Sequence, residues 1–578
     1  MGAAALAGVV ALGAPVARGE TAAYWVFFRD RGPAAASDSA LAAAARGLTP
    51  RTLARRAKAA RERGEATMGR APVDERDLAP DRGYVAAVEG AGVTLRTESR
   101  WLNAVSVECD APLLDAVRAL SFVAEVSPVA VAATNAAPGA GGPDTPYTIA
   151  DSDARFDAAY SDAARRLDAA QRADQFDYGP SAHQLEMLGV PEAQAMGYHG
   201  EGVLVCVLDS GFELSHEAFG QLQVVATRDF IFHDEYVGYD AAQDAPSQAN
   251  HGTMVLSALA GYAPGRLVGP AYRAEFLLGK TEDNRSETPA EEDNWCAGIE
   301  WAEAMGADMV TTSLGYTTWY RPQDADGRTG VVSRLANTAF DHGLLIVNSA
   351  GNGGPRDRTV GPPADAPGVI SVGSVDWNGR ISGFSSRGPT WDGRVKPDVV
   401  AMGSGVTLVT ARSWDRYGRG NGTSFAAPLV AGCAALVIGA HPEWGPETLR
   451  GALVMSGDRA AKPDPTYGWG VPNVRDAILY PAIEGRVTDF HTHEPIAGAR
   501  VSWEPAGPVD STRAAPGDSP PRGVARSDST GAYAAPNLPP GVYRLRVNAD
   551  GYFEGVTEAL EVPPNLGDVN VVLRYRGE

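Results

Sequence analysis

The stretch Asn421–Pro428, with the sequence N-G-T-S-F-A-A-P, places Ser424 directly before a run of small and apolar residues that continues to Val437. This pattern predicts a buried helix that begins close to Ser424. The first N–H groups of such a helix have no partners within it, and the positive end of its dipole favours negative charge. A serine there can attack a carbonyl carbon while its own backbone N–H binds the resulting oxyanion. Serine is also a common helix cap, so the stretch needs support from other motifs.

Three further stretches place a polar residue where a predicted strand ends or a predicted helix begins. Asp209, in V-L-D-S-G, directly follows an apolar strand, and Asn352, in S-A-G-N, follows another. His251, in N-H-G-T, opens an apolar helical run. Each has an ordinary interpretation on its own, as a turn residue or as one of nine histidines. Together, however, the histidine can offer one ring nitrogen to Ser424 and the other to Asp209, while the asparagine can donate to an oxyanion.

The order Asp, His, Asn, Ser along the chain resembles that of the subtilisin-like serine peptidases, the subtilases. The resemblance covers residues 181–480 and is specific, because four ordered motifs rarely coincide by chance. A lipase-like hydrolase is disfavoured, since G-T-S-F-A is not G-x-S-x-G and the order of the triad differs. Four shorter stretches support the resemblance: T-S-L-G at 312–315, F-S-S-R-G-P at 384–389, K-P-D-V-V-A at 396–401 and Y-G-W-G at 467–470.

The resemblance implies a role for each of the four residues. Ser424 would be the nucleophile, and His251 would take its proton as a base and later protonate the leaving amine. Asp209 would hold the imidazole in the correct tautomer, and Asn352, with the Ser424 N–H, would bind the oxyanion. Met254 stands where many family members have a second histidine, and we expect no loss of mechanism from this difference. The edges expected to bind the substrate backbone and shape the S1 pocket are Ser313, Leu314, Gly315, Ser349, Ala350 and Gly351.

Residues 181–482 alternate predicted strands with predicted helices. The strands are fully apolar, which is typical of a parallel sheet covered on both faces. The pattern therefore predicts a doubly wound α/β domain, in which ligands bind at the carboxyl ends of the strands. The clearest strands are 203–208, 309–312, 344–347 and 369–372, and the clearest helices are 295–305 and 332–342.

Residues 23–130 are predicted to form a small α+β domain with the ferredoxin-like order β-α-β-β-α-β. We interpret the arginine-rich helix 51–63 as a solvated face rather than a binding patch. With W-L-N-A at 101–104, the domain resembles the inhibitory propeptide of secreted bacterial subtilases. The resemblance implies an intramolecular inhibitor whose tail enters the cleft and is cut within the Ala- and Gly-rich linker 131–180. The expected strands are 24–28, 84–88, 93–97, 104–109 and 122–126, and a second helix follows Asp110.

Residues 483–578 contain only short predicted strands and turns, which indicates a small all-β sandwich. His491 and His493 could bind a metal ion, but a polar turn at the end of a strand is the simpler interpretation. The domain resembles the carboxypeptidase regulatory-like, transthyretin-like sandwiches, which implies an accessory role. The matching stretches are I-E-G-R-V-T-D at 483–489, E-P-I-A-G-A-R-V at 494–501, D-S-T-G-A-Y at 528–533 and L-P-P-G-V-Y at 538–543.

The first 22 residues contain an apolar run at 3–17 that is too short to span a bilayer. It resembles the core of a secretory signal, with Ala17-Arg18-Gly19 as one candidate cleavage site, although the usual basic start is missing. We therefore expect secretion. No later run is judged long enough for a membrane helix, so no integral membrane segment is expected.

Length and composition limit the classes of protein to consider. A chain of 578 residues should hold several domains, and its 44% hydrophobic and 21% charged residues are ordinary for globular proteins. The net charge of −21 argues against nucleic acids and anionic membranes as partners. No two cysteines form a C-x-x-C pair, which disfavours zinc and thioredoxin-type sites, while a disulfide stays possible. The four cysteines are Cys109, Cys206, Cys296 and Cys433.

The expected partners are protein or peptide substrates and the chain's own propeptide, and we expect a monomer. The resemblance implies no required cofactor. Family members often bind calcium, but the sequence shows no dense acidic loop to which a calcium site can be assigned. An alternative from another class is a catalytically silent peptidase fold that serves as a binding or display protein; the intact set of four polar residues argues against it.

Overall fold

The computed structural model describes residues 21–32, 38–63, 65, 72–129, 177–285, 290–317, 320–509, 523–535, 538, 541–562 and 569–577. The expected signal segment, up to residue 20, and the linker up to residue 176 lie outside the described residues. The chain divides into two compact units. The first contains residues 1–41 and 74–132, and the second contains residues 42–73 and 133–578.

The second unit is built around a seven-stranded sheet in which every neighbouring pair is parallel. This sheet confirms the α/β class predicted from the apolar strands. Its strand order is β13-β12-β11-β10-β5-β9-β6. The chain adds β6 and β9 on one side of β5, and then β10 to β13 on the other side, which makes the sheet doubly wound. The strands are β5 (Leu204–Asp209), β6 (Gln223–Asp229), β9 (Glu275–Lys280), β10 (Met309–Thr312), β11 (Leu345–Ser349), β12 (Ile370–Val375) and β13 (Val399–Met402).

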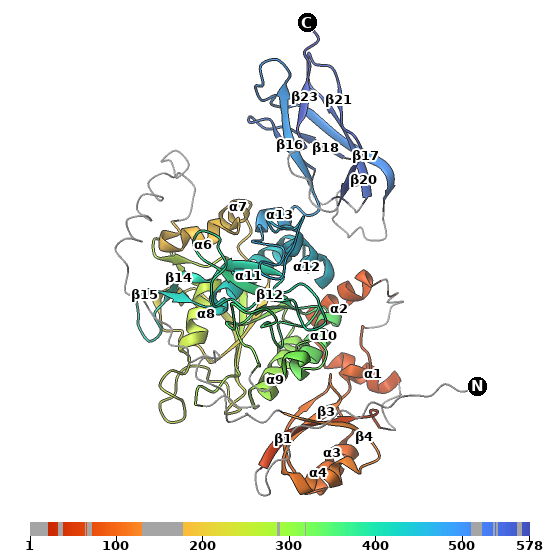
Figure 1. The fold of residues 1–578 in the computed structure, drawn as a ribbon, viewed down its shortest axis with the longest axis vertical. Coiled ribbons are helices and arrows are strands. Elements are labelled where there is room, and N and C mark those ends of the chain that lie inside the picture. The colour runs from red at the N-terminus through yellow and green to blue at the C-terminus, as the bar shows by residue number, and fades with distance from the viewer. Residues whose placement is uncertain are drawn as a thin grey trace, which may run out of the picture. The chain divides into compact units, whose positions relative to one another are not determined.

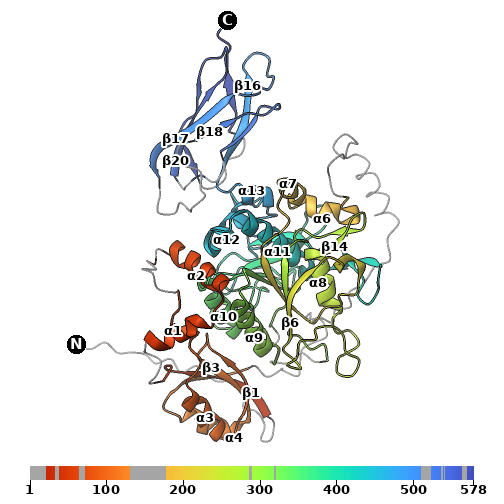
Figure 2. The ribbon, with the colours of Figure 1, turned by 180° about the vertical axis from the view of Figure 1, so that it is seen from behind.

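Helices lie on both faces of this sheet (Figures 1 and 2). Alternate residues of the strands pack against the helices of opposite faces. Val205 and Val207 belong to the core cluster that includes α8 (Asn250–Ala260) and α11 (Thr423–Ala440). Leu208 faces α9 (Ala290–Met305), where Gly298 leaves room for its side chain. Helix α10 (Val331–Asp341) packs beside α9. The remaining elements of this domain are α6 (Ala182–Glu186), α7 (Val190–Ala195), α12 (Pro446–Met455), α13 (Val474–Ile478), β7 (Tyr262–Ala263), β8 (Leu267–Val268), β14 (Ser404–Val409) and β15 (Tyr417–Asn421), with 3₁₀ turns at Gly179–Ser181, Glu217–Phe219 and Pro322–Asp324.

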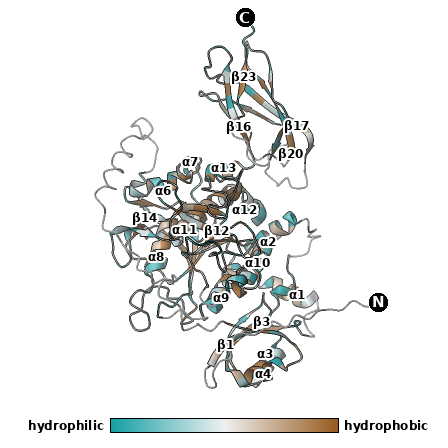
Figure 3. Ribbon diagram, in the orientation of Figure 1, coloured by the Kyte–Doolittle hydropathy of each residue, from teal (hydrophilic) through white to brown (hydrophobic). Residues whose placement is uncertain are grey.

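Helix α11 begins at Thr423, inside the N-G-T-S-F-A-A-P stretch. Within the described residues it is the one helix long and apolar enough to cross a membrane, so the expectation that no run reaches that length was wrong. Its apolar surface (largely brown in Figure 3) is buried inside the protein over 89% of its 18 residues, as expected for a core helix. All four cysteines are buried and free, so no disulfide forms among them.

The first unit contains one antiparallel sheet with the order β2-β3-β1-β4. Helices α3 (Arg82–Gly90) and α4 (Ala111–Arg118) contribute residues to the same core as β1, which gives the predicted order β-α-β-β-α-β. The strands are β1 (Thr21–Phe28), β2 (Thr94–Ser99), β3 (Ala104–Asp110) and β4 (Val123–Pro128). Helix α1 (Asp38–Arg46) spans the boundary between the two units in sequence.

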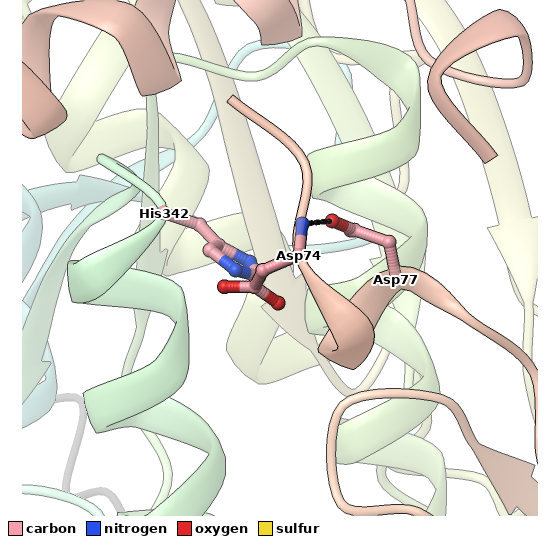
Figure 4. A group of neighbouring side chains, drawn as sticks. All are labelled: Asp74, Asp77 and His342. Atoms are coloured by element: carbon pink, nitrogen blue, oxygen red, sulfur yellow. Dashed lines mark hydrogen bonds between the residues drawn. The ribbon is translucent and has the colours of Figure 1, made fainter. Parts of the chain in front are cut away.

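The predicted strand at 84–88 was wrong, because these residues lie in helix α3. The Asp81 carboxylate caps this helix by accepting the backbone N–H groups of Gly83 and Tyr84. Val85 and Val88 are buried and lie three residues apart, on one face of the helix. A similar local cap precedes α3 in the 3₁₀ turn Glu75–Asp77, where the Asp77 carboxylate accepts the Asp74 backbone N–H at 3.0 Å (Figure 4).

The interpretation of residues 51–63 as a solvated helix face was also wrong. They form helix α2 (Pro50–Glu62), capped by Thr49 as its sequence suggests, but Arg55 and Arg56 are only 3% and 2% exposed. By its contacts, α2 belongs with the parallel-sheet unit and not with the antiparallel sheet. Helix α3 takes the position of the first helix in the β-α-β-β-α-β order.

The C-terminal residues form two sheets that enclose a separate hydrophobic core. The predicted all-β sandwich is therefore observed. The Asp489 carboxylate accepts the backbone N–H groups of His491 and Thr492, so the two histidine positions lie in a polar turn at the end of a strand, as expected. One sheet contains β19 (Ala532–Ala535), β16 (Ile483–Asp489) and β23 (Val571–Leu573), and the other contains β18 (Gly523–Arg526), β17 (Arg500–Val509), β20 (Gly541–Asn548), β21 (Gly555–Val556) and β22 (Leu560–Val562).

Candidate active site

Asp209 and His251 form a buried hydrogen-bonded pair at the carboxyl edge of the parallel sheet. Asp209 is the last residue of β5, and His251 is the second residue of α8. The His251 Nδ1 lies 2.7 Å from the Asp209 Oδ1. Because an ionised carboxylate can only accept, Nδ1 carries the proton in this pair, and Nε2 is left as the basic nitrogen. Asp209 is held in turn by the Ser210 backbone N–H, at 2.7 Å.

Ser424 is the second residue of α11 and lies in the first turn of that helix, as predicted. Its side chain is mostly buried, and its Oγ donates to the Ser313 carbonyl at 3.4 Å. In return, the Ser313 Oγ donates to the Ser424 carbonyl at 2.8 Å. The ring of the next residue, Phe425, lies 5.9 Å from the His251 ring, centroid to centroid. The packing of α11 against α8 therefore brings the serine and the histidine to the same place.

Asn352 is fixed by the residue that precedes the serine. Its Oδ1 lies 3.0 Å from both the backbone N and the Oγ1 of Thr423. Because a backbone N–H can only donate, the atom that it contacts must be the amide oxygen of Asn352. The orientation of the side chain is thus set, and its Nδ2 group is the donor that can bind an oxyanion beside the first turn of α11.

A single pocket of about 340 Å³ contains most of the predicted site. It is lined by His251, Asn352 and Ser424, while Asp209 is fully buried and hydrogen-bonded to His251. The pocket has the size of a small-ligand site, and its wall includes both backbone edges expected to hold a substrate. All six residues predicted for those edges line it: Ser313, Leu314, Gly315, Ser349, Ala350 and Gly351.

Asn348 joins the two edges and was not identified from the sequence. It is fully buried in β11, and its Nδ2 donates to the Leu314 carbonyl at 3.0 Å and to the Ser349 carbonyl at 2.7 Å. The Asn348 side chain therefore fixes the spacing between the backbone segments at Leu314 and Ser349, the two edges between which a peptide would lie. A polar residue at the end of an otherwise apolar strand is the signal that could have revealed it.

Two glycines allow the histidine helix to approach the aspartate strand. A Cβ at Gly252 would lie 2.2 Å from the Gly211 carbonyl oxygen and 3.0 Å from the Asp209 Cβ. Gly211 itself has a positive φ of 113°, which favours glycine. The glycines in V-L-D-S-G and N-H-G-T are thus explained by close backbone packing beside the His251–Asp209 pair.

A buried lysine lies next to Asp209 in the sheet. Lys280, the last residue of β9, pairs with Asp209 in the β5–β9 register. Its Nζ lies 2.9 Å from Asp229 and 2.8 Å from Asp244, and all three side chains are almost completely buried. Burial alone would lower the pKa of Lys280, but hydrogen bonds to the two carboxylates outweigh it and raise the pKa. One buried cation therefore serves two buried carboxylates, and the sequence analysis missed this cluster.

The K-P-D-V-V-A stretch forms a second buried charge cluster. The Asp398 Oδ2 accepts from the Lys396 Nζ at 2.6 Å and from the Ser371 backbone N–H at 2.8 Å. Arg450 of α12 donates to the other carboxylate oxygen. Burial alone would raise the pKa of Asp398, but Lys396 and Arg450 outweigh it and lower the pKa. The cluster connects β12 and the residues directly before β13 to α12.

One wall of the pocket is made by a tyrosine and a glutamate that the sequence analysis did not single out. The Tyr316 hydroxyl donates to the Glu282 carboxylate at 2.8 Å, and both residues line the pocket. Burial, together with the charge of Glu282, raises the pKa of Tyr316 well above its usual value. The hydroxyl therefore keeps its proton and remains a donor to the carboxylate.

A serine in the first turn of a buried helix, in one pocket with a histidine that is hydrogen-bonded to an aspartate, is an arrangement compatible with a serine hydrolase of the doubly wound α/β class. Three family models match the chain: the subtilase family over residues 200–470, the Bacteroidota peptidase S8 propeptide domain over residues 23–140, and the carboxypeptidase regulatory-like domain over residues 482–574. The chain belongs to the subtilase family and is a serine-type endopeptidase.

Individual relatives agree with this assignment. Subtilisin E of Bacillus subtilis (strain 168) is 30% identical over 296 residues, which cover 51% of this chain and 70% of that protein. The subtilisin of Bacillus pumilus is also 30% identical over 296 residues, covering 51% of this chain and 97% of that protein. The crystal structure of fervidolysin from Fervidobacterium pennivorans superposes with a TM-score of 0.51 at 20% identity, over 86% of this chain and 77% of that chain, and supports the fold.

Proposed function

We propose that this endopeptidase cleaves peptide bonds through the triad Asp209, His251 and Ser424, and that it is made as a self-processing precursor. The observation that carries the proposal is the 2.7 Å hydrogen bond from His251 to Asp209, beside a pocket that also contains Ser424 and Asn352. A buried carboxylate that fixes the tautomer of an imidazole next to a serine is the arrangement that activates a serine hydroxyl.

In the first half of the reaction, the Ser424 Oγ attacks the carbonyl carbon of the scissile bond and its proton passes to the His251 Nε2. Asp209 stabilises the imidazolium that forms. The negative oxygen of the tetrahedral intermediate accepts hydrogen bonds from the Asn352 Nδ2 and the Ser424 backbone N–H. When the intermediate collapses, the C–N bond breaks, His251 gives its proton to the leaving amine, and an ester to Ser424 remains.

In the second half, water replaces the amine. His251 takes a proton from the water, whose oxygen attacks the ester carbon, and the same donors bind the second oxyanion. Collapse of this intermediate returns the proton to the Ser424 Oγ and releases the new carboxyl end. Every proton transfer uses His251, so none of these steps needs a cofactor.

We further propose that residues 23–130 are the inhibitory propeptide, that residues 131–180 contain the maturation site, and that 181–482 and 483–578 are the peptidase domain and the accessory sandwich. The match of the propeptide family to residues 23–140 supports the zymogen architecture. The apolar run at 3–17 supports secretion. The substrates would be proteins or peptides that can enter the pocket in an extended conformation.

The test is to measure the intact mass of the expressed wild-type chain beside the Ser424→Ala variant. We expect the wild type to lose its first hundred-odd residues, and the variant to fold and stay uncut. Efficient self-cleavage of the variant would disprove the assigned nucleophile. If both chains stay full length, the protein does not process itself and the zymogen proposal fails.

A further inference from the structure

Helix α2 is packed into the parallel-sheet unit. Contacts place residues 42–73 with residues 133–578, although the propeptide family match spans residues 23–140. Both ribbon views show α2 beside α12 and α10 of the peptidase domain (Figures 1 and 2). A segment of the expected propeptide is thus part of the packing of the peptidase domain.

Two arginines of α2 bind one glutamate in the interior. Arg55 and Arg56 donate to the same oxygen, Oε1 of Glu303, at 3.0 and 2.8 Å. Glu303 belongs to α9 and is fully buried, and Arg55 also donates to the Ala307 carbonyl. The Thr52 Oγ1 donates to the backbone carbonyl of Glu303 at 2.8 Å. Charges this deeply buried are tolerated only when they are paired, so α2 and Glu303 are mutually required in this position.

The two ends of α2 make further contacts of the same kind. Near its start, Arg51 binds Asp308 and donates to the Gly202 carbonyl at 2.6 Å. At its end, the Glu62 carboxylate accepts the first free N–H groups of α12, those of Gly445, Glu447 and Thr448, at 2.9 to 3.2 Å. Glu62 therefore caps a helix that lies almost 400 residues further along the chain, where the dipole favours a negative charge.

The contacts of Arg51 lie at the edge of the sheet opposite to the proposed catalytic residues. Asp308 directly precedes β10, and Gly202 lies just before β5, so both are at the amino ends of parallel strands. Asp209 is at the carboxyl end of β5. At about 3.3 Å per residue, the six residues of β5 separate the two edges by roughly 17 Å.

We propose that α2 is a separate anchor, which holds the propeptide on the peptidase domain after the chain has been cut, by docking an Arg-Arg helix into an acidic socket distant from the active site. Glu303 and Asp308 form the acidic part of the socket, and the free N–H groups at the start of α12 complete it by binding Glu62. The inference rests on the proposed zymogen, whose regulation it specifies. Inhibition then has two components: a segment that reaches the active site, and an anchor whose release controls how long the fragment stays bound.

The anchor can be tested without any catalytic activity. The full-length Ser424→Ala chain receives a recognition site for an external, site-specific protease between residues 131 and 176, and is then cut by that protease. Native mass spectrometry and size-exclusion chromatography over a dilution series measure the dissociation constant of the propeptide fragment. We expect the parent fragment to stay bound at nanomolar concentration.

Two variants remove the ion triad from opposite sides. Glu303→Gln changes the socket, and Arg55→Met with Arg56→Met changes only α2, so a folding defect in one variant does not decide the result. Removing one side of a buried ion pair should weaken binding by roughly 10²- to 10³-fold in each variant. Glu192→Gln, at an exposed glutamate of α7, removes the same charge elsewhere and should leave the constant unchanged.

Either of two results would overturn the proposal. If the parent fragment dissociates at micromolar concentration, α2 is no anchor. If both variants retain the fragment as tightly as the parent, other contacts hold it. Since the measurement uses an inactive chain, it is independent of whether the wild type cleaves itself, and a failure of the zymogen proposal would appear separately in the intact masses.

Discussion

The close approach of Gly252 to the aspartate strand predicts that Gly252→Ala damages catalysis although it removes no catalytic group. Gly252 follows His251 in α8, and its backbone does not have a positive φ, so alanine suits the helix itself. The difficulty is space, because a Cβ would lie 2.2 Å from the Gly211 carbonyl oxygen. That carbonyl lies two residues after Asp209, and therefore any relief moves the histidine and the aspartate apart.

The size of the effect follows from that distance. Non-bonded carbon and oxygen atoms rarely approach closer than about 3.2 Å, so α8 must move away by about 1 Å. A misplacement of about 1 Å in a catalytic group costs on the order of 10²-fold in rate. Overpacking should also destabilise the fold by about 1–3 kcal/mol. We thus expect kcat to fall about a hundredfold in a protein that remains folded.

The assay compares kcat for a short peptide amide, with the enzyme concentration taken from titration with a covalent serine-directed inhibitor. Gly451→Ala is the matched control, because a Cβ at that helical position meets nothing within 4 Å and should stabilise α12 by up to about 1 kcal/mol. Thermal unfolding in the Ser424→Ala background separates catalysis from stability. A Gly252→Ala enzyme with kcat within threefold of the wild type would show that this contact does not set the catalytic geometry.

Three further substitutions test other parts of the domain. Asn352→Ala should lower kcat by about 10²–10³ with little change in KM, the range found for this donor in a subtilisin, and an unchanged kcat would exclude it from the oxyanion site. Lys280→Met leaves two buried carboxylates without a cation and should cost about 3–5 kcal/mol in denaturant unfolding of the Ser424→Ala chain; a loss below 1 kcal/mol would contradict this. Asp398→Asn tests the lowered pKa of that carboxyl in the folded protein. The stability that the ionised carboxylate contributes to the fold is complete above the ordinary aspartate pKa near 3.8, and it is lost as the pH falls through the lower pKa of the folded state. The difference in Tm between parent and variant should therefore be constant from pH 7 to 5 and shrink below about pH 4, and a difference that grows in acid would refute the assignment.

The arrangement of the proposed catalytic residues was predictable because each one is marked by its local sequence. Asp209 ends an apolar strand, and His251 and Ser424 begin apolar helices. In a parallel sheet, strands end and the following helices begin at the carboxyl edge, so the sequence places all three residues there. The role of Asn348 was not predicted, because its neighbours in sequence indicate only a buried strand. Its importance arises from two carbonyl partners, one of which lies 34 residues away in sequence.

The two errors in the first hundred residues have different causes. Residues 84–88 were interpreted as a strand from their composition, whereas the Asp81 cap and the spacing of Val85 and Val88 decide for a helix. The arginines of α2 were interpreted as solvated because charged residues almost always are. Their burial depends on Glu303, more than 240 residues away, and no local pattern reveals a buried counter-charge at that separation.

The two charged features of the peptidase domain therefore predict different experimental effects. The Asp209–His251 pair lies at the carboxyl edge of the sheet, where, under the proposed mechanism, a shift of about 1 Å should change the rate. The Glu303 socket lies at the amino edge, about 17 Å away along β5, and binds a helix without reaching the reacting atoms. Substitutions in the socket should then change the dissociation rate of the propeptide while kcat of the released enzyme stays constant. Substitutions at Gly252 should lower kcat while the dissociation rate of the propeptide stays constant. The two sets of variants therefore separate inhibition from catalysis within one domain.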